Sequence, residues 1–316
     1  MADKVTIAPF QSADLDGVVD LLNRELTADP MQSAVFQRKV LLDINFNPQG
    51  APVAKIGGEV VGFMLGNVRT HTMEDQHPDY DRGYISLVAV DKAHQRQGIG
   101  TMLWEQVKSY FQAMKCKVAT VSTYAPNYFV PGIDQAAYPG AIEFFKKQGF
   151  QVPVTVISMD TPLVHLVTPD WIKEKETKLT SEGVLFDALK PEHILPLLDH
   201  LRECFPGDWQ RYMRESMTRI TLGDFDRGQV YVAMHDGKCL GFCQHDLDRF
   251  GPFGVDDKER GRGIGAVLLL KCLRGMKAMG FHNAWFISTT DDAAKVYMHG
   301  GFKETRRHAV MKKTME

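Results

Sequence analysis

The chain has almost no charge imbalance, no long apolar run and few cysteines. Its 37 Lys and Arg residues nearly balance 39 Asp and Glu residues, for a net charge of −2, so it lacks the basic footprint of a nucleic-acid-binding domain. No apolar run reaches the roughly 18 residues of a membrane helix, and the N-terminal residues lack the apolar core of a signal peptide. The five cysteines are odd in number and lack a metal-knuckle spacing. We therefore expect a cytoplasmic protein with reduced thiols and without nucleic-acid, membrane or metal partners.

A glycine-rich phrase occurs twice, each time after an apolar strand pattern and before an amphipathic helix pattern. The copies, Gln95–Gly100 and Arg260–Gly265, are separated by about half of the 316 residues. This repetition predicts two related α/β domains. A helix start offers unpaired N–H groups and the positive end of the helix dipole, and glycine lets a phosphate approach the backbone. Each phrase is therefore predicted to cradle a pyrophosphate.

The hydrophobic pattern of the first half predicts alternating strands and helices. We expect strands at 4–8, 52–56, 60–68, 84–90, 118–122 and 154–159, and helices beginning near Asp14 or Asp16 and at 32–42, 98–114 and 139–148. The Gly57-Gly58-Glu59 turn indicates a hairpin.

The second half repeats this order. We expect strands at 184–188, 229–234, 238–245, 252–255, 284–288 and 307–311, and helices at 194–204, 209–217, 263–279 and 293–299. The predicted organisation is an N-terminal domain at 1–160, a connector at 161–182 with a strand and one helical turn, and a C-terminal domain at 183–316.

This order resembles the GNAT superfamily of N-acetyltransferases. The (Gln/Arg)-x-x-Gly-x-(Gly/Ala) signature of that family appears at both loops. A second motif, an alanine followed four residues later by an aromatic and then by x-x-x-Gly-Phe, appears as Ala141, Phe145 and Gly149-Phe150, and again as Ala293, Tyr297 and Gly301-Phe302. The resemblance implies an α/β fold of two tandem GNAT domains, each a mostly antiparallel twisted sheet with flanking helices.

The resemblance also implies acetyl-CoA as cofactor and the primary amine of a small molecule as acceptor. In the family the glycine loop holds the coenzyme A pyrophosphate, and two splayed strands admit its pantetheine arm. The positions that then bind coenzyme A are Gln95, Arg96, Gln97, Gly98, Ile99 and Gly100 in the first half, and Val255, Arg260, Gly261, Arg262, Gly263, Ile264, Gly265 and Thr290 in the second.

The two halves differ at the position of the general acid implied by the resemblance. Tyr297 occupies it in the second half, whereas Phe145 in the first half has no proton to donate. We therefore expect catalysis in the C-terminal domain, with the N-terminal domain non-catalytic or structural. His245 and Asp246 are the candidates for the base, since histidine titrates near neutrality; a solvated turn is the alternative reading of this segment.

Aromatic and acidic residues near the expected acceptor site suggest an amino sugar such as glucosamine. They are Asp208, Trp209, Tyr212 and Asp248 in the second half, and Tyr128, Asp134 and Tyr138 in an inserted segment of the first. The Pro131-Gly132-Ile133-Asp134 part of that insert resembles bacterial tandem glucosamine/glucosaminide N-acetyltransferases; a structural insert that joins the domains is the other interpretation.

The chain is expected to be a monomer or a homodimer. Two other functions stay open. The first is a mycothiol-synthase-like enzyme that acts on a cysteinyl amine. The second is a coenzyme A-binding sensor without turnover.

Overall fold

The computed structural model describes residues 4–71, 79–122, 124–224 and 228–315. These residues form two compact units. Unit 1 contains the described residues of 4–155 together with 308–315, and unit 2 contains those of 156–307. No helix in the described ranges is both long enough and apolar enough to span a membrane.

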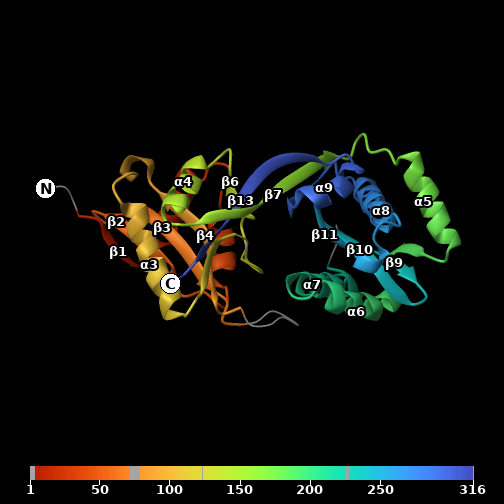
Figure 1. The fold of residues 1–316 in the computed structure, drawn as a ribbon, viewed down its shortest axis with the longest axis horizontal. Coiled ribbons are helices and arrows are strands. Elements are labelled where there is room, and N and C mark those ends of the chain that lie inside the picture. Colours follow the sequence, from red (N-terminus) through yellow and green to blue (C-terminus); the bar gives the residue numbers. More distant parts are fainter. Residues whose placement is uncertain (1–3, 72–78, 123, 225–227, 316) are drawn as a thin grey trace. The chain divides into compact units, whose positions relative to one another are not determined.

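The elements of the first half follow the predicted order (Figure 1). They are β1 (Thr6–Pro9), α1 (Leu15–Glu25), α2 (Ser33–Phe36), β2 (Pro52–Ile56), β3 (Glu59–Val68), β4 (Arg82–Val90), α3 (Ile99–Ala113), β5 (Val118–Val121), β6 (Ile133–Asp134) and α4 (Pro139–Lys147).

The second half repeats the pattern. β7 (Gln151–Pro162) closes the first half in sequence, and α5 (Asp170–Ser181) lies in the connector. The elements of the second half are β8 (Leu185–Ala188), α6 (Ile194–Cys204), α7 (Asp208–Leu222), β9 (Gly228–His235), β10 (Lys238–Asp246), β11 (Arg249–Val255), α8 (Ile264–Ala278), β12 (Asn283–Thr289), α9 (Asp291–Met298) and β13 (Lys303–Thr314). The connector carries a longer helix than the single turn expected, because Ile172 and Leu179 of α5 are buried in the core of unit 2.

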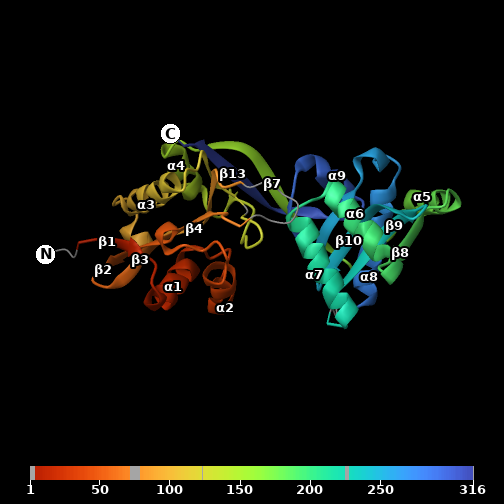
Figure 2. The same cartoon turned by 90° about the horizontal axis from the view of Figure 1, so that it is seen from below.

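Each unit is a mostly antiparallel sheet with helices on both faces, as predicted. The strand order is β1-β2-β3-β4-β5-β13 in unit 1 and β7-β12-β11-β10-β9-β8 in unit 2. In Figure 2, α1 and α2 lie on one side of the unit 1 strands and α3 on the other. Val18 and Leu22 of α1 and Leu103 and Val107 of α3 are buried at helical spacing, which explains why these amphipathic segments cover the sheet.

The closing strands are exchanged between the repeats. β7 follows the first half in sequence, yet its residues 157–162 pair with β12 of the second half. β13 ends the second half, yet its residues 311–314 pair with β5 of the first. The observed unit boundaries therefore differ from the predicted ones, which follow chain order and assign the last strand to the C-terminal domain.

In each repeat the parallel strand pair that leads to the glycine loop is hydrogen-bonded over only part of its length. The parallel pairing of β4 with β5 ends at Ile85 and Val121, while β4 continues to Val90. An extra residue in β4, Ser86, produces a β-bulge against β3 at this point. The parallel pair β11 and β12 is joined at Arg249 and Trp285. The bulge and the end of pairing together turn the second part of β4 away from β5.

Candidate functional site

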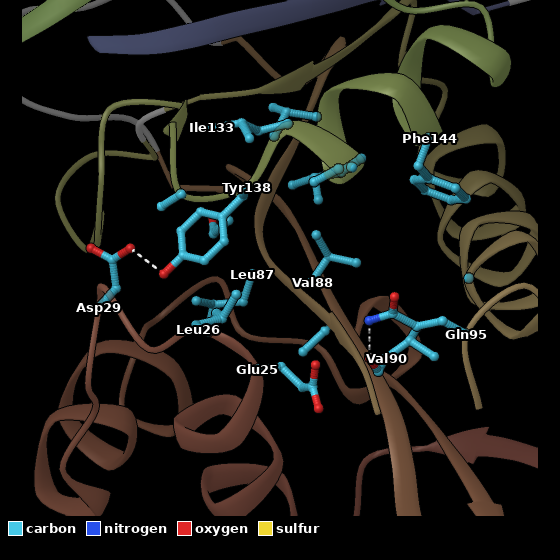
Figure 3. Close-up of a pocket in the computed structure, with 18 of the residues that line it drawn as sticks. Glu25, Leu26, Asp29, Leu87, Val88, Val90, Gln95, Ile133, Tyr138 and Phe144 are labelled. Carbon is cyan, nitrogen blue, oxygen red and sulfur yellow. Dashed lines mark hydrogen bonds between the residues drawn. The ribbon is translucent and has the colours of Figure 1, made fainter. Parts of the chain in front are cut away.

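A cavity of about 860 Å³ lies in unit 1 against the splayed end of β4. Its lining includes the β4 residues 85–90, much of the first glycine loop, the end of α1, and the insert residues Phe129, Ile133 and Tyr138. Figure 3 shows Tyr138 extending across this space toward Asp29, with Val88 and Gln95 on the side of β4. The cavity thus connects the predicted phosphate cradle with an acidic region.

The first glycine loop has the geometry of an anion cradle. Gly98 precedes α3 with φ 87°, a left-handed conformation that glycine adopts without strain. A Cβ added there would meet nothing within 4 Å. The Gln95 side chain donates to the Val90 carbonyl at 2.9 Å, which ties the loop to the end of β4. The first N–H groups of α3 are left for a ligand.

The cations beside this loop have no acidic partner within the described part of the chain. Lys92 and Arg96 both line the cavity and are exposed, and neither forms an ion pair among the described residues. Neighbouring Asp91 is used elsewhere, since it pairs with Arg24 at 3.1 Å. The positive potential near Gly98 is therefore available to an anion.

Acidic side chains line the cavity along the end of α1 and the loop that follows it, with Glu25 beside the glycine loop and Asp29 beyond it. Glu25 Oε1 accepts a hydrogen bond from the backbone N–H of Lys92 at 3.0 Å. The Tyr138 hydroxyl donates to Asp29 Oδ2 at 2.9 Å and accepts from the Ala28 N–H at 3.1 Å. These contacts hold two carboxylates and a phenol at fixed positions in the wall. Such groups can bind an ammonium ion and take its proton.

Apolar side chains and one unpaired hydroxyl complete the lining. Leu26, Met31, Val35 and Phe129 provide an apolar surface next to the carboxylates. The Ser86 hydroxyl at the β-bulge is buried without a hydrogen-bond partner among the described residues, so it can donate to a bound molecule.

The second glycine loop has the same backbone but crowded surroundings. Gly263 precedes α8 with φ 99°. A Cβ there would lie 3.3 Å from Cδ of Lys175, a residue of α5. Arg262 pairs with Glu259 and with Glu182, the latter at 3.1 Å. This second loop, predicted like the first to bind coenzyme A, is therefore contacted by a helix, and its Arg262 is already paired with two carboxylates.

Aromatic rings from β11, β12 and α9 cluster beside the second glycine loop. Tyr297 packs against Phe286 with ring centroids 4.4 Å apart and against Phe253 at 5.7 Å. Phe250 and Phe302 complete the cluster. Burial raises the pKa of the Tyr297 phenol well above its ordinary value. The predicted general acid thus packs against an aromatic cluster and is partly buried.

The predicted base residues lie in different environments. His245 is 0% exposed, and its Nδ1 lies 3.1 Å from the Leu247 carbonyl oxygen. Burial lowers its pKa. Asp246 instead lies beside Tyr212 and Arg219, at 3.4 Å from each. Asp248 is exposed, and its backbone carbonyl accepts from the Trp285 N–H.

The remaining predicted acceptor residues of the second half, and Thr290 from its predicted coenzyme A positions, each contact other residues of unit 2. Asp208 pairs with Arg211 at 3.0 Å. Trp209 stacks on Phe205 with centroids 5.2 Å apart. Thr290 caps α9, where its hydroxyl accepts from the Ala293 N–H. Tyr212 also lies under the Arg249 guanidinium, 5.4 Å from the ring centroid.

Of the three predicted acceptor residues in the first half, Tyr138 lines the cavity. Asp134 and Tyr128 instead make contacts that hold the inserted segment in place. The Asp134 side chain is buried and accepts from the backbone N–H groups of Ala136 and Ala137 at 2.8 and 3.0 Å. The Tyr128 carbonyl accepts from the Lys39 ammonium at 2.7 Å. These contacts fix the inserted loop so that Phe129 and Tyr138 face the cavity.

Sequence reasoning missed Glu25, Asp29 and Ser86. The signal for the first two is present in the sequence, because Glu25 ends the first helix and Asp29 follows it, in the segment that in the second half contains the acceptor candidates Asp208 and Trp209. Ser86 was not recognisable, since its role depends on a bulge that appears only in the strand register.

Comparison with known proteins places this geometry among acetyltransferases. A model of the acetyltransferase (GNAT) family matches residues 15–150 and 194–302. The chain is 26% identical over 125 residues to N-alpha-acetyltransferase 30 of Dictyostelium discoideum, which covers 39% of this chain and 62% of that protein. It is 30% identical over 122 residues to an uncharacterized N-acetyltransferase of Methanocaldococcus jannaschii, covering 38% and 69% of the two chains.

Solved structures with low identity share the tandem arrangement. A glucosamine N-acetyltransferase region of a fungal multi-domain GH3 β-N-acetylglucosaminidase matches with a TM-score of 0.77 and 19% identity, covering 99% of this chain and 38% of that chain. A tandem GNAT protein from the clavulanic acid biosynthesis pathway matches with a TM-score of 0.62 and 15% identity, covering 99% of both chains. These likenesses show the fold.

Proposed function

The chain belongs to the GNAT family of acetyltransferases, and from this premise we propose that it transfers an acetyl group from acetyl-CoA to a primary amine in the cavity of unit 1. The observation that carries the proposal is the continuity of that cavity from the first glycine loop to Glu25 and Asp29. A donor phosphate site and an amine site must lie within one space for direct transfer.

The residues of the cavity have distinct roles in this proposal. The loop at Gly98 and the cations Lys92 and Arg96 hold the pyrophosphate of acetyl-CoA, which supplies the acetyl group as a thioester. Glu25 and Asp29 bind the ammonium form of the acceptor and take its proton. The Tyr138 hydroxyl returns a proton to the departing thiolate, a role that the buried Phe145 lacks the chemistry to fill.

The acceptor that we propose first is an amino sugar. Glu25, Asp29, Ser86 and Tyr138 offer hydrogen-bonding groups for hydroxyls and an amine, and the fungal relative of similar fold carries a glucosamine N-acetyltransferase region. The second candidate is the α-amino group of a peptide. It is favoured by the apolar surface of Leu26, Met31, Val35 and Phe129 next to the carboxylates, and an N-alpha-acetyltransferase is among the relatives.

Transfer at the second glycine loop, with Tyr297 as acid, stays the competing hypothesis. Turnover of acetyl-CoA with a panel of amino sugars, peptides, polyamines and cysteinyl amines tests the activity and the acceptor together. We expect one coenzyme A per chain by calorimetry and turnover with at least one amine. Glu25→Gln and Asp29→Asn should lower kcat/KM by about tenfold or more, with acetyl-CoA affinity retained.

The panel also has results that count against the proposal. Tight coenzyme A binding without turnover of any amine would favour the sensor hypothesis. Turnover that survives both carboxylate substitutions would move the amine site away from this cavity. Turnover with cysteinyl amines alone would support the mycothiol-synthase-like alternative.

A further inference from the structure

A histidine, a cysteine and an aspartate come together in unit 2. None of them belongs to the cavity of unit 1 in which we propose catalysis. His200 and Cys204 are one helical turn apart on α6, and Asp256 follows β11. One potential ligand atom from each residue lies within 4.8 Å of the other two. His200 is 5% exposed, and the other two are partly buried.

The repeat shows that this combination is specific to the second half. Where α6 has Leu197, His200 and Leu201, α1 has Val18, Leu21 and Leu22 at the same spacing. His200 thus replaces a leucine, Leu21, that is 0% exposed. Cys204 stands at the position of Glu25. Asp256 corresponds to Asp91, and both cap the short turn after the strand by accepting a backbone N–H two residues on.

The His200 imidazole has no partner that accounts for its burial. Its Nε2 is buried without a hydrogen-bond partner among the described residues. Its other neighbours are the rings of Phe205 and Phe242, at 5.5 and 6.0 Å. A buried polar group without a partner costs about 1–3 kcal/mol, so a leucine would pack here at lower cost. A ligand for the imidazole would remove this penalty.

We propose that His200, Cys204 and Asp256 bind a divalent cation of the zinc class, with a fourth position open to water. Nitrogen, thiolate and carboxylate ligands together suit Zn²⁺, which accepts all three. Tetrahedral ligands at about 2.0–2.3 Å from zinc lie roughly 3.3–3.8 Å from one another. Side-chain rotations that move the ligand atoms by about an ångström would therefore complete the site. The cation joins α6 to the end of β11 and to the turn before the second glycine loop.

Metal binding is coupled to the protonation of the ligands. Burial lowers the pKa of the His200 imidazole, and the neutral ring is the form that binds a metal. Burial and then the Asp256 carboxylate raise the pKa of the Cys204 thiol. The cation therefore displaces a proton from sulfur to solvent as the metal–sulfur bond forms, and no oxidant or reductant is needed.

Cobalt(II) titration of the chelator-treated, dialysed full-length protein tests the site. We expect one Co²⁺ per chain, a near-ultraviolet thiolate-to-cobalt charge-transfer band, and displacement of cobalt by Zn²⁺. Cys204→Ser should abolish the band. His200→Leu and Asp256→Asn should weaken affinity by about tenfold or more, and zinc should raise the Tm of the parent but not of His200→Leu.

The repeat supplies matched controls. His200→Leu restores the residue type of Leu21 and should fold. Asp91→Asn changes the equivalent cap in unit 1, and Cys116→Ser removes a thiol of that unit; both should bind cobalt as the parent does. The proposal is overturned if the parent shows no thiolate band, or if Cys204→Ser and Asp256→Asn bind cobalt like the parent. It also fails if Cys239→Ser, and not Cys204→Ser, removes the band.

Discussion

The two glycine loops share a backbone and differ in what surrounds it. Gly98 and Gly263 have φ values of 87° and 99° and begin helices of equal length. Around Gly98 the space is open, and Lys92 and Arg96 have no acidic partner in the part of the chain that the structure describes. Around Gly263, Lys175 approaches from α5 and Glu182 pairs with Arg262. The motif thus specifies the cradle, and residues outside the motif decide whether a phosphate can enter it.

The same contrast holds for the gap between the splayed strands. Counted from the two glycines, Val88 corresponds to Phe253 and Val121 to Phe286. Val88 and Val121 line the cavity of unit 1, whereas the two phenylalanines pack with Tyr297. An aromatic ring has more surface than a valine, so at these two positions the second repeat packs aromatic rings where the first has valines that line a cavity.

The largest expected effect separates the two loops directly. Gly98→Ala should lower kcat/KM for acetyl-CoA by about 100-fold, because a methyl group would occupy the phosphate approach. Gly263→Ala should change it by less than about threefold. Both positions have positive φ, so both substitutions cost a similar backbone strain of about 1 kcal/mol. Calorimetry with coenzyme A and steady-state kinetics measure the difference; the reverse pattern would assign transfer to unit 2.

The second comparison concerns Val88 of β4 and the corresponding Phe253 of β11. Val88→Phe should raise KM for acetyl-CoA by about tenfold or more, because the ring would occupy the cavity beside β4. Phe253→Ala should leave the kinetics unchanged and lower the free energy of unfolding by about 3 kcal/mol or less, since Phe253 is only partly buried. Denaturant unfolding and initial rates measure the two effects. A Val88→Phe protein with parental KM would show that the donor does not pass this residue.

The sequence predicted the repeated elements because they depend on local patterns. The stripe of Val18 and Leu22 marks a helix whatever its partners are, and a glycine at a strand-to-helix turn marks a cradle. The exchange of β7 and β13 was not predictable in this way. Either closing strand offers an alternating antiparallel edge to β5 or β12, so chain order gives no sign of which repeat it will join.

The sequence names candidate site residues only where a motif does. The family acid position singles out Tyr297 and Phe145, but whether a tyrosine faces a cavity depends on neighbours far away in sequence, such as Phe250. Likewise, Lys175 reaches Gly263 from a helix in the predicted connector. These contacts arise from packing between elements, which the residues of one motif do not encode.

The two candidate acids give the next comparison. Tyr138→Phe should lower kcat by about tenfold at neutral pH, because it removes the hydroxyl that Asp29 orients. Tyr297→Phe should leave kcat unchanged, since its ring is packed among aromatic side chains. Each substitution keeps the ring and removes one oxygen, so the pair is matched in volume. Loss of kcat in Tyr297→Phe alone would restore the second half as the catalytic domain.

The loop arginines provide a smaller contrast. Arg96→Met should raise KM for acetyl-CoA by about three- to tenfold and reduce its dependence on salt, because an unpaired cation beside the phosphate is lost. Arg262→Met should change neither quantity, because Glu259 and Glu182 already neutralise that guanidinium. Kinetics at two ionic strengths measure both. Equal effects of the two substitutions would contradict the assignment of the donor to the first loop.

The smallest expected effect concerns pH and the core of unit 2. His245 is buried between Tyr231 of β9 and Phe281, with Asp246 adjacent in the chain, where the first repeat has Gly66. Burial lowers the pKa of His245 below the ordinary 6.5, so between the folded and unfolded pKa values the unfolded chain binds the extra proton. The free energy of unfolding should therefore fall as pH decreases below 6.5, by at most about 1.4 kcal/mol per pH unit for this residue. His245→Phe should flatten this slope in urea unfolding, measured with chelator present so that no metal contributes. An unchanged slope in His245→Phe would mean that the ring is protonated equally in both states, and that its burial in unit 2 does not control its charge.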